Sequence, residues 1–257
     1  MMNRLAGKTA LITGASSGIG QACAELLAAD RVNLILVARR EDRLIRLKEK
    51  LLKTHDINVT LVQCDVSRKD DVALKFNEIT RNHTIDILIN NAGLAAGLEK
   101  MDEGRIDDWE AMIDTNIKGV LYVGKAVIPQ MRKNNSGHIV NLGSIAGEMA
   151  YPGGNVYCAT KAAVKMLNDA LNIDLVGTNI RVFNICPGAV NTNFSMVRFK
   201  GDQKRSDGVY AGYEPLTAND IADLIVYVLN APAHVNIQSA VIMPTSQRNS
   251  YVLHRNT

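Results

Sequence analysis

Short apolar runs alternate with helical patterns along the 257 residues of this chain. The first run, Thr9 to Thr13, leads into a helical pattern through Ala29. The second, Val32 to Ala38, leads into another over Glu41 to Lys53. Further apolar runs are Val59 to Cys64, Ile85 to Ile89, His138 to Leu142, Ile180 to Ile185 and Ala240 to Met243. Apolar strands separated by helices indicate a parallel sheet that is covered on both faces.

The remaining helical patterns cover Val72 to Ile79, Trp109 to Met131, Val156 to Leu175 and Asn219 to Leu229. We therefore expect an α/β fold, a single Rossmann-like, doubly wound parallel sheet of about seven strands with helices on both faces. No repeat or linker divides the chain, so residues 1–257 are expected to form one dinucleotide-binding catalytic domain. The one long irregular segment is Arg198 to Gly212, within a predicted substrate loop around residues 191–214. Loops of that length are often lids.

The composition favours a globular, cytoplasmic protein. Hydrophobic residues make up 47% of the chain, which is enough for a substantial core. No apolar run approaches the roughly 18 residues of a membrane span, and Met1 to Leu5 is too short and polar for a signal peptide. The net charge is +3, from scattered basic and acidic residues. We expect no membrane and no nucleic-acid partner.

The cysteines and histidines suggest no metal site. Cys23, Cys64, Cys158 and Cys186 lie far apart without a CxxC spacing, so neither zinc nor a disulfide framework is indicated. Buried thiols in a reducing compartment fit this pattern better. None of the five histidines forms a ligand pair at helical spacing.

A glycine-rich turn follows the first predicted strand. Gly14, Gly18 and Gly20 lie between Thr13 and a helical pattern. Glycines let the backbone approach a phosphate, and the free N–H groups of a helix N-terminus attract it. The spacing differs from the G-x-G-x-x-G fingerprint, but the position after the first strand is the one that a dinucleotide fold requires.

The second predicted strand ends in Ala38-Arg39-Arg40. An enzyme specific for NAD would carry an acid here, about twenty residues past the glycines, to bind the ribose 2′-hydroxyl. Two arginines in its place favour NADP. The alternative is that they only begin a solvated helix.

A serine, a tyrosine and a lysine form the candidate chemical centre. Tyr157 and Lys161 are four residues apart in a predicted helix and therefore share one face. A nearby ammonium lowers the pKa of a phenol, which makes it a better base. Ser144 follows the predicted strand that ends at Leu142, at the end of the sheet where open α/β folds bind ligands. Alternatively, these are a core tyrosine, a surface lysine and a loop serine.

Amides mark two further positions. Asn90-Asn91-Ala92-Gly93 follows the fourth predicted strand, where small residues let a cofactor ring pass closely. Asn116 is polar among apolar neighbours in a predicted helix. It is either functional or a satisfied core asparagine.

Together these motifs resemble those of the short-chain dehydrogenases/reductases, and the likeness covers nearly the whole chain. The matching motifs are Thr13-Gly14-Ala15-Ser16-Ser17-Gly18-Ile19-Gly20, Asn90-Asn91-Ala92-Gly93, Asn116, Ser144 with Tyr157 and Lys161, and Pro187-Gly188 followed by Thr192. The resemblance implies that Tyr157 is the general acid/base and that Ser144 holds the substrate oxygen. It implies that Lys161 lowers the tyrosine pKa and binds the nicotinamide ribose, and that Asn116 keeps a water in the proton relay.

The resemblance also implies a homotetramer. The residues expected to bind NADP are Gly14, Ser16, Ser17, Gly18, Ile19, Gly20, Arg39, Arg40, Asp65, Val66, Asn91, Ala92, Gly93, Tyr157, Lys161, Pro187, Gly188, Val190 and Thr192.

Within this family the chain is similar to the NADP-dependent 3-hydroxy acid dehydrogenases, the group that includes serine and allo-threonine dehydrogenases. The likeness rests on Asp108-Trp109-Glu110, Tyr151 to Tyr157, Phe194 to Asp202 and His234-Val235-Asn236-Ile237. The group usually has an acid where this chain has Cys186, so the exact substrate is open. The expected reaction is hydride transfer between NADP(H) and a small 3-hydroxy acid or its carbonyl counterpart.

Two other functions stay open: a 3-oxoacyl thioester reductase, which shares the fold and the catalytic residues, and a non-catalytic NADP-binding sensor. An activated phenol argues against the sensor, since a pure binding protein has no use for it.

An acidic substrate needs a cation to offset the desolvation of its carboxylate. Arg198, Lys200, Lys204 and Arg205 cluster in the predicted loop. Lys204 and Arg205 can equally be solvated surface residues. Arg198 lies between Val197 and Phe199 and is the preferred candidate.

Overall fold

The computed structural model describes residues 3–256 and contains the predicted parallel sheet. Its strands are β1 (Thr9–Thr13), β2 (Asn33–Ala38), β3 (Val59–Gln63), β4 (Ile87–Asn90), β5 (Gly137–Leu142), β6 (Ile180–Pro187) and β7 (Ser239–Ile242). The seven strands pair in the order β3-β2-β1-β4-β5-β6-β7, all of them parallel. The chain builds the sheet outwards from β1 in one direction and then from β4 in the other. The expected doubly wound fold is confirmed.

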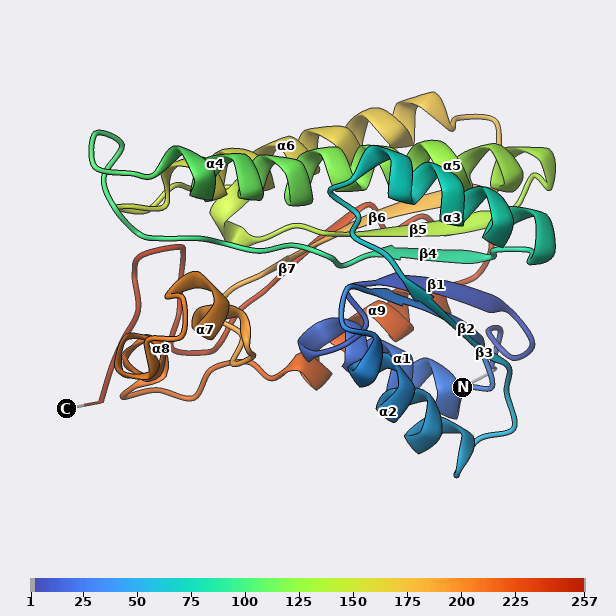
Figure 1. Cartoon of the computed structure of the whole chain (residues 1–257), viewed down its shortest axis with the longest axis horizontal. Coiled ribbons are helices and arrows are strands. Elements are labelled where there is room, and N and C mark those ends of the chain that lie inside the picture. The colour runs from blue at the N-terminus through green and yellow to red at the C-terminus, as the bar shows by residue number, and fades with distance from the viewer. Residues whose placement is uncertain (1–2, 257) are drawn as a thin grey trace.

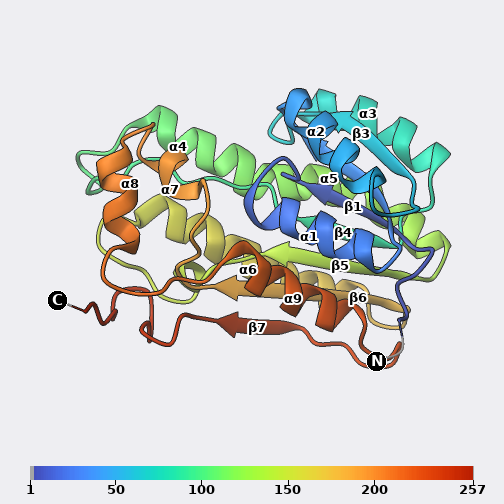
Figure 2. The same cartoon turned by 90° about the horizontal axis from the view of Figure 1, so that it is seen from below.

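Helices cover both faces of the sheet (Figures 1 and 2). One layer holds α1 (Gly18–Ala29), α2 (Glu41–Leu52) and α9 (Ala218–Leu229); the other holds α3 (Lys69–Asn82), α4 (Ile106–Ile113), α5 (Gly119–Lys133) and α6 (Asn155–Asp174). Each layer has its own core because successive side chains of a strand point to opposite faces. In β1, Ile12 packs with Leu27 and Ile225, whereas Leu11 packs with Phe76 and Val127.

The long helix predicted over Trp109 to Met131 contains a turn that the sequence pattern did not indicate. Between α4 and α5, residues Asp114–Lys118 form a π-helical turn, in which the Gly119 N–H bonds to the Asp114 carbonyl. Such turns are rare and are often found at functional sites. This one carries Asn116.

The expectation of an irregular segment from Arg198 to Gly212 was wrong. After β6 the chain forms two short helices, α7 (Phe194–Arg198) and α8 (Gln203–Tyr210), which lie beyond one end of the sheet (Figure 1). The Asp202 side chain caps α8 by accepting a 3.0 Å hydrogen bond from the Arg205 N–H. The helix is polar and buries only Ser206, so it has no apolar stripe by which a sequence pattern could reveal it.

Within residues 3–256, the four cysteines are buried free thiols. None of the helices in that range has the length and apolar character needed to cross a membrane.

Candidate active site

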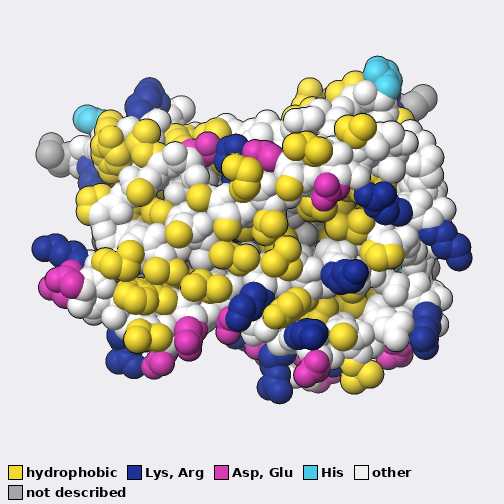
Figure 3. Space-filling view, turned by 90° about the horizontal axis from the view of Figure 1, so that it is seen from above, with side chains coloured by type: hydrophobic (Ala, Val, Ile, Leu, Met, Phe, Trp, Pro, Cys, Tyr) yellow, Lys and Arg dark blue, Asp and Glu magenta, His cyan; other side chains and the backbone are white. Residues whose placement is uncertain are grey.

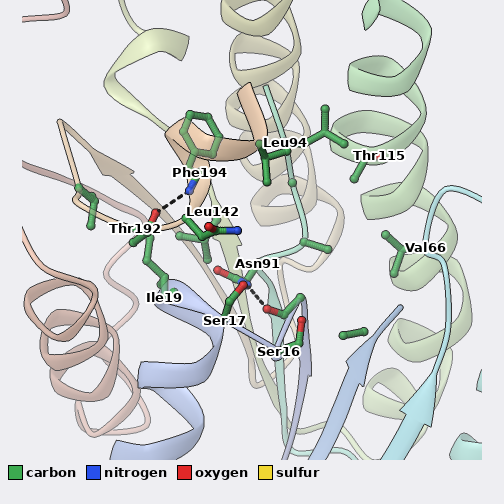
Figure 4. Close-up of a pocket in the computed structure, with 18 of the residues that line it drawn as sticks. Ser16, Ser17, Ile19, Val66, Asn91, Leu94, Thr115, Leu142, Thr192 and Phe194 are labelled. Atoms are coloured by element: carbon green, nitrogen blue, oxygen red, sulfur yellow. Dashed lines mark hydrogen bonds between the residues drawn. The ribbon is translucent and has the colours of Figure 1, made fainter. Parts of the chain in front are cut away.

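A cavity of about 270 Å³ lies where the direction of winding changes, at the carboxyl ends of the central strands. Open α/β sheets bind their ligands at this place. Of the predicted site residues, the cavity is lined by Gly14, Ser16, Ser17, Gly18, Ile19, Arg39, Arg40, Asp65, Val66, Asn91, Ala92, Gly93, Ser144, Tyr157, Lys161, Pro187, Gly188, Val190 and Thr192. Gly20 and Asn116 are buried beside it. Figure 4 shows Ser16 and Ser17 at one end and Leu94 and Phe194 at the other.

The glycine-rich turn forms one end of the cavity. Gly14 has a φ of +67°, and a Cβ there would lie 2.8 Å from Asn91 Nδ2. Only glycine fits this conformation and this close approach. Asn91 Nδ2 donates hydrogen bonds to the carbonyls of Thr13 (2.9 Å) and Gly14 (3.2 Å), which join the ends of β1 and β4.

The N-terminus of α1 points into the same end of the cavity. Helix α1 begins at Gly18, and the Ser17 side chain caps none of its described N–H groups. The first-turn N–H groups therefore remain available to an anion, whose negative charge the helix dipole favours.

Both arginines after β2 lie at this phosphate-binding end. Arg40 Nη2 donates hydrogen bonds of 3.1 Å to the hydroxyls of Ser16 and Ser17. Partial burial and the neighbouring charges of Arg43 and Arg39 lower the pKa of Arg40. Three cations held together attract a multivalent anion such as a ribose 2′-phosphate.

Helix α6 supplies Tyr157 and Lys161, one turn apart and both buried. Lys161 Nζ lies 6.0 Å from the centre of the Tyr157 ring and donates a 2.6 Å hydrogen bond to the Leu142 carbonyl. Ser144 follows β5, and its hydroxyl accepts a 3.1 Å hydrogen bond from the Ala146 N–H in a short 3₁₀ turn. The structure thus brings the three predicted chemical groups to one cavity.

Burial controls the ionisation of the tyrosine and the lysine. It raises the pKa of Tyr157 well above the usual value of a phenol, against the opposing effects of a hydrogen bond from Ser144 and the charge of Arg198. Burial also lowers the pKa of Lys161 to about 8. Lys161 is not among the groups that shift the tyrosine pKa, so desolvation dominates and the Tyr157 phenol is protonated at neutral pH.

Asn116 is bonded at both ends of its side chain. Its Oδ1 accepts from the Leu94 N–H at 2.9 Å, and its Nδ2 donates to the Leu94 carbonyl at 2.8 Å and to Thr160 Oγ1 at 3.0 Å. Both polar groups of the side chain therefore have protein partners. Asn116 ties the segment after β4 to α6 and so positions the cavity wall beside Tyr157.

Arg198, at the end of α7, stands over the candidate chemical centre. Its guanidinium carbon is 5.7 Å from the centre of the Tyr157 ring. Nη1 donates to the Tyr151 hydroxyl at 2.7 Å, and Nε donates to the Gly97 carbonyl at 2.9 Å. It is therefore held in place as the sequence suggested.

Several lining residues were not predicted. They are Val37, Ala38, Cys64, Leu94, Thr115, Leu142, Gly143, Asn193, Phe194 and Val197. The Phe194 ring is 5.6 Å from the Tyr157 ring, centre to centre. Most are apolar residues whose types do not distinguish a cavity wall from a core. Their position next to a strand end or the Thr192 motif was the only signal available.

Comparison with known proteins identifies the family. Residues 8–203 match the family model described as short chain dehydrogenase. The chain belongs to the short-chain dehydrogenases. It is an oxidoreductase, as the sequence motifs indicated.

The most informative relatives span nearly the whole chain. The NADP-dependent 3-hydroxy acid dehydrogenase of Schizosaccharomyces pombe is 41% identical over 256 residues, covering 99% of each chain. The sulfoacetaldehyde reductase 2 of Chromohalobacter salexigens is 43% identical over 239 residues, covering 92% of this chain and 94% of the relative. A closed form of serine dehydrogenase complexed with NADP⁺ is 40% identical, with a TM-score of 0.89, covering 96% of this chain and all of that one.

Proposed function

We propose that this short-chain dehydrogenase transfers a hydride reversibly between NADP(H) and a small 3-hydroxy acid or its carbonyl counterpart. The observation that carries the proposal is the guanidinium of Arg198, 5.7 Å from the centre of the Tyr157 ring, because it puts a cation beside the phenol. A substrate with both a hydroxyl and an acid group would place the hydroxyl at Tyr157 and the acid group at Arg198.

The cavity fits NADP. The glycine-rich turn and the free N–H groups of α1 would hold the pyrophosphate, and Arg39 and Arg40 would hold the 2′-phosphate. Asp65 and Val66 would flank the adenine, while Asn91, Ala92 and Gly93 would line the nicotinamide side. Lys161 would bind its ribose. Bound NADP supplies the hydride acceptor or, when reduced, the hydride donor.

Tyr157 is proposed to move the proton. Its raised pKa keeps the phenol protonated at neutral pH, so it is suited to donate a proton to a carbonyl oxygen during reduction. The Ser144 hydroxyl would hold that oxygen. Asn116 would keep a water in the proton relay, as the family resemblance implies, and its hydrogen bonds to Leu94 and Thr160 would position the cavity wall.

Arg198 is proposed to bind the acid group of the substrate. A 3-hydroxy acid and sulfoacetaldehyde, named in two relatives, both carry an anion a short distance from the reacting carbon. A guanidinium can bind a carboxylate or a sulfonate because both offer oxygens to its fork of N–H donors. The relatives' names therefore support an acidic substrate without deciding which one.

The family likeness and the exposed apolar side chains on α5 and α6 support a homotetramer. The four buried free thiols support a cytoplasmic location. We also propose that the chain forms a single catalytic domain and that residues 191–214 close its substrate side.

The decisive experiment compares a hydroxy acid with the matching neutral alcohol in Arg198→Met, which keeps length but removes charge. KM for the acid should rise by about ten- to a hundredfold, and KM for the neutral alcohol should change little. Arg46→Met is the matched control, because it removes the same charge from α2, where Arg46 pairs with Asp42.

Equal effects of Arg198→Met on both substrates would show that Arg198 does not bind the carboxylate. An acyl thioester included in the same panel tests the alternative reductase. If only the thioester is reduced, the proposed substrate class is wrong.

A further inference from the structure

Residues 246–256 contact both the cavity wall after β6 and the end of α8. Residues 246–254 form a small hairpin, in which the Arg248 N–H bonds to the Val252 carbonyl and the His254 N–H to the Ser246 carbonyl, both at 2.9 Å. Gln247 anchors it to the cavity wall: its Oε1 accepts a 2.8 Å hydrogen bond from the Ala189 N–H. A Cβ on Gly188 would lie 2.5 Å from the same oxygen, so only glycine permits this contact.

Beyond the hairpin, the Arg255 side chain hydrogen-bonds to the carboxyl end of α8. Its guanidinium donates to the carbonyls of Gly208 (3.3 Å), Val209 (3.0 Å) and Ala211. It also lies 5.3 Å from the centre of the Tyr213 ring. The next N–H, of Asn256, bonds to the Gly212 carbonyl at 2.6 Å.

Helix α8 needs such an external partner. Its last carbonyls lack the N–H donors of a continuing helix, and a cation is favoured at the negative end of the helix dipole. A helix that buries only Ser206 and contains Gly208 has little apolar packing and weak helix propensity. Arg255 supplies these partners at the carboxyl end of α8, while Asp202 caps its other end.

Hydrogen bonds link α8 to α7, on the substrate side of the cavity. Tyr210, its last residue, donates a 2.9 Å hydrogen bond to the Val190 carbonyl, and its hydroxyl is 2.8 Å from Ser195 Oγ. Ser195 is buried in α7, between Phe194 and the turn that ends at Arg198. A shift of α8 would thus displace the two α7 side chains that face Tyr157.

We infer that Arg255 is a positioning residue: it holds α8, and through Tyr210 and Ser195 it holds α7, so that Arg198 and Phe194 stay against Tyr157. Because Gln247 fixes the same segment to the Gly188-Ala189 turn, the C-terminal segment joins the cofactor wall to the substrate wall. The kinetic part of this inference rests on the proposed function, whereas the structural part does not.

Hydrogen exchange of the full-length protein tests the structural part without a substrate. In Arg255→Met, backbone N–H groups of residues 203–212 should exchange at least about tenfold faster, while those of β1 and α1 stay unchanged. Arg255→Lys should recover part of the protection because an ammonium can still donate to these carbonyls. Arg248→Met is the matched control, since Arg248 Nη1 donates to the carbonyls of Thr245 (2.6 Å) and Gln247 (3.3 Å) and, among the described residues, makes no hydrogen bond to α8.

Kinetics test the link to Arg198. Arg255→Met should raise KM for the hydroxy acid about tenfold and leave the Kd of NADP within about twofold. In an Arg198→Met background the same change should add less than about twofold, because coupled residues are not additive. The inference would be overturned if Arg255→Met left hydrogen exchange in α8 unchanged or raised it equally in α1. It would also be overturned if the KM increases of Arg198→Met and Arg255→Met multiplied fully in the double variant. If the unaltered protein turns over no hydroxy acid but α8 exchanges faster in Arg255→Met, the proposed function is wrong, whereas the role of Arg255 in holding α8 is confirmed.

Discussion

At the scale of single residues, the site depends on two ionisable groups that share one buried space. Desolvation favours the neutral form of each, the phenol of Tyr157 and the amine of Lys161. The Lys161 ammonium is retained at neutral pH with a 2.6 Å bond to the Leu142 carbonyl, which partly offsets its burial. This arrangement favours proton donation over proton abstraction near pH 7.

Tyr157→Phe should therefore lower turnover by about 10² to 10⁴, because the ring is kept but its proton is lost. NADP affinity, measured by fluorescence titration, should change little. Tyr227→Phe is the matched control, because Tyr227 is an exposed tyrosine on α9. The unaltered enzyme should also oxidise the alcohol faster as the pH rises above 7, since the raised pKa makes the phenolate scarce at neutral pH. Near-full activity of Tyr157→Phe would rule out its role.

Residue type and spacing could predict the polar part of this site but not its apolar walls. Tyr157 and Lys161 are recognisable from the motifs that accompany them, the glycine-rich turn and Asn90-Asn91-Ala92-Gly93, because their spacing alone also fits a core tyrosine and a surface lysine. Phe194 and Leu94 are indistinguishable from core residues until the fold brings them to the cavity. The dominance of burial over charge at Tyr157 was equally hidden, because desolvation depends on every element that packs around the ring.

At the scale of secondary-structure elements, the end of β2 is the proposed determinant of cofactor choice. Ala38→Asp with Arg39→Leu should weaken NADP binding by about ten- to a hundredfold and strengthen NAD binding, because the acid can accept from a ribose hydroxyl and the cation is lost. Arg40 still contacts Ser16 and Ser17, so adding Arg40→Leu should complete the reversal.

Titration with both dinucleotides measures these preferences. Arg46→Leu removes the same charge from α2, where Arg46 pairs with Asp42, and serves as the control. Equal affinity of the unaltered protein for NAD and NADP would contradict the assignment of both arginines.

Elements with a clear apolar period were predictable to within a few residues. Strand β1 has the predicted bounds, and α2 ends one residue early. The π turn and helix α8 were not predicted, because neither changes the apolar period of the sequence. The π turn at Asp114–Lys118 interrupts a helix without changing its composition, and α8 is held by Asp202 and Arg255 instead of by an apolar face. Local periodicity carries no information on such contacts.

At the scale of the whole molecule, the layer of α4, α5 and α6 presents an apolar outer face (Figure 3). The exposed apolar side chains on or next to these helices are Ile106, Ile113, Leu121, Met166, Ile173 and Val176. Met166 and Ile173 are 65% and 74% exposed, although they lie on a helix whose other face is buried in the core. A grouped apolar face of this kind usually marks a contact with another chain, and it supports the proposed homotetramer.

Leu121→Glu combined with Met166→Glu should therefore break the tetramer into smaller species, because a symmetric interface would bury each new carboxylate on both sides of the contact. Light scattering at micromolar concentration measures the mass directly. Leu52→Glu is the matched control: Leu52 is similarly exposed, but it lies on α2, in the opposite layer. The catalytic groups all come from one chain, so the dissociated variant should keep measurable turnover. A monomeric mass for the unaltered protein would contradict the tetramer and leave the apolar face without this explanation.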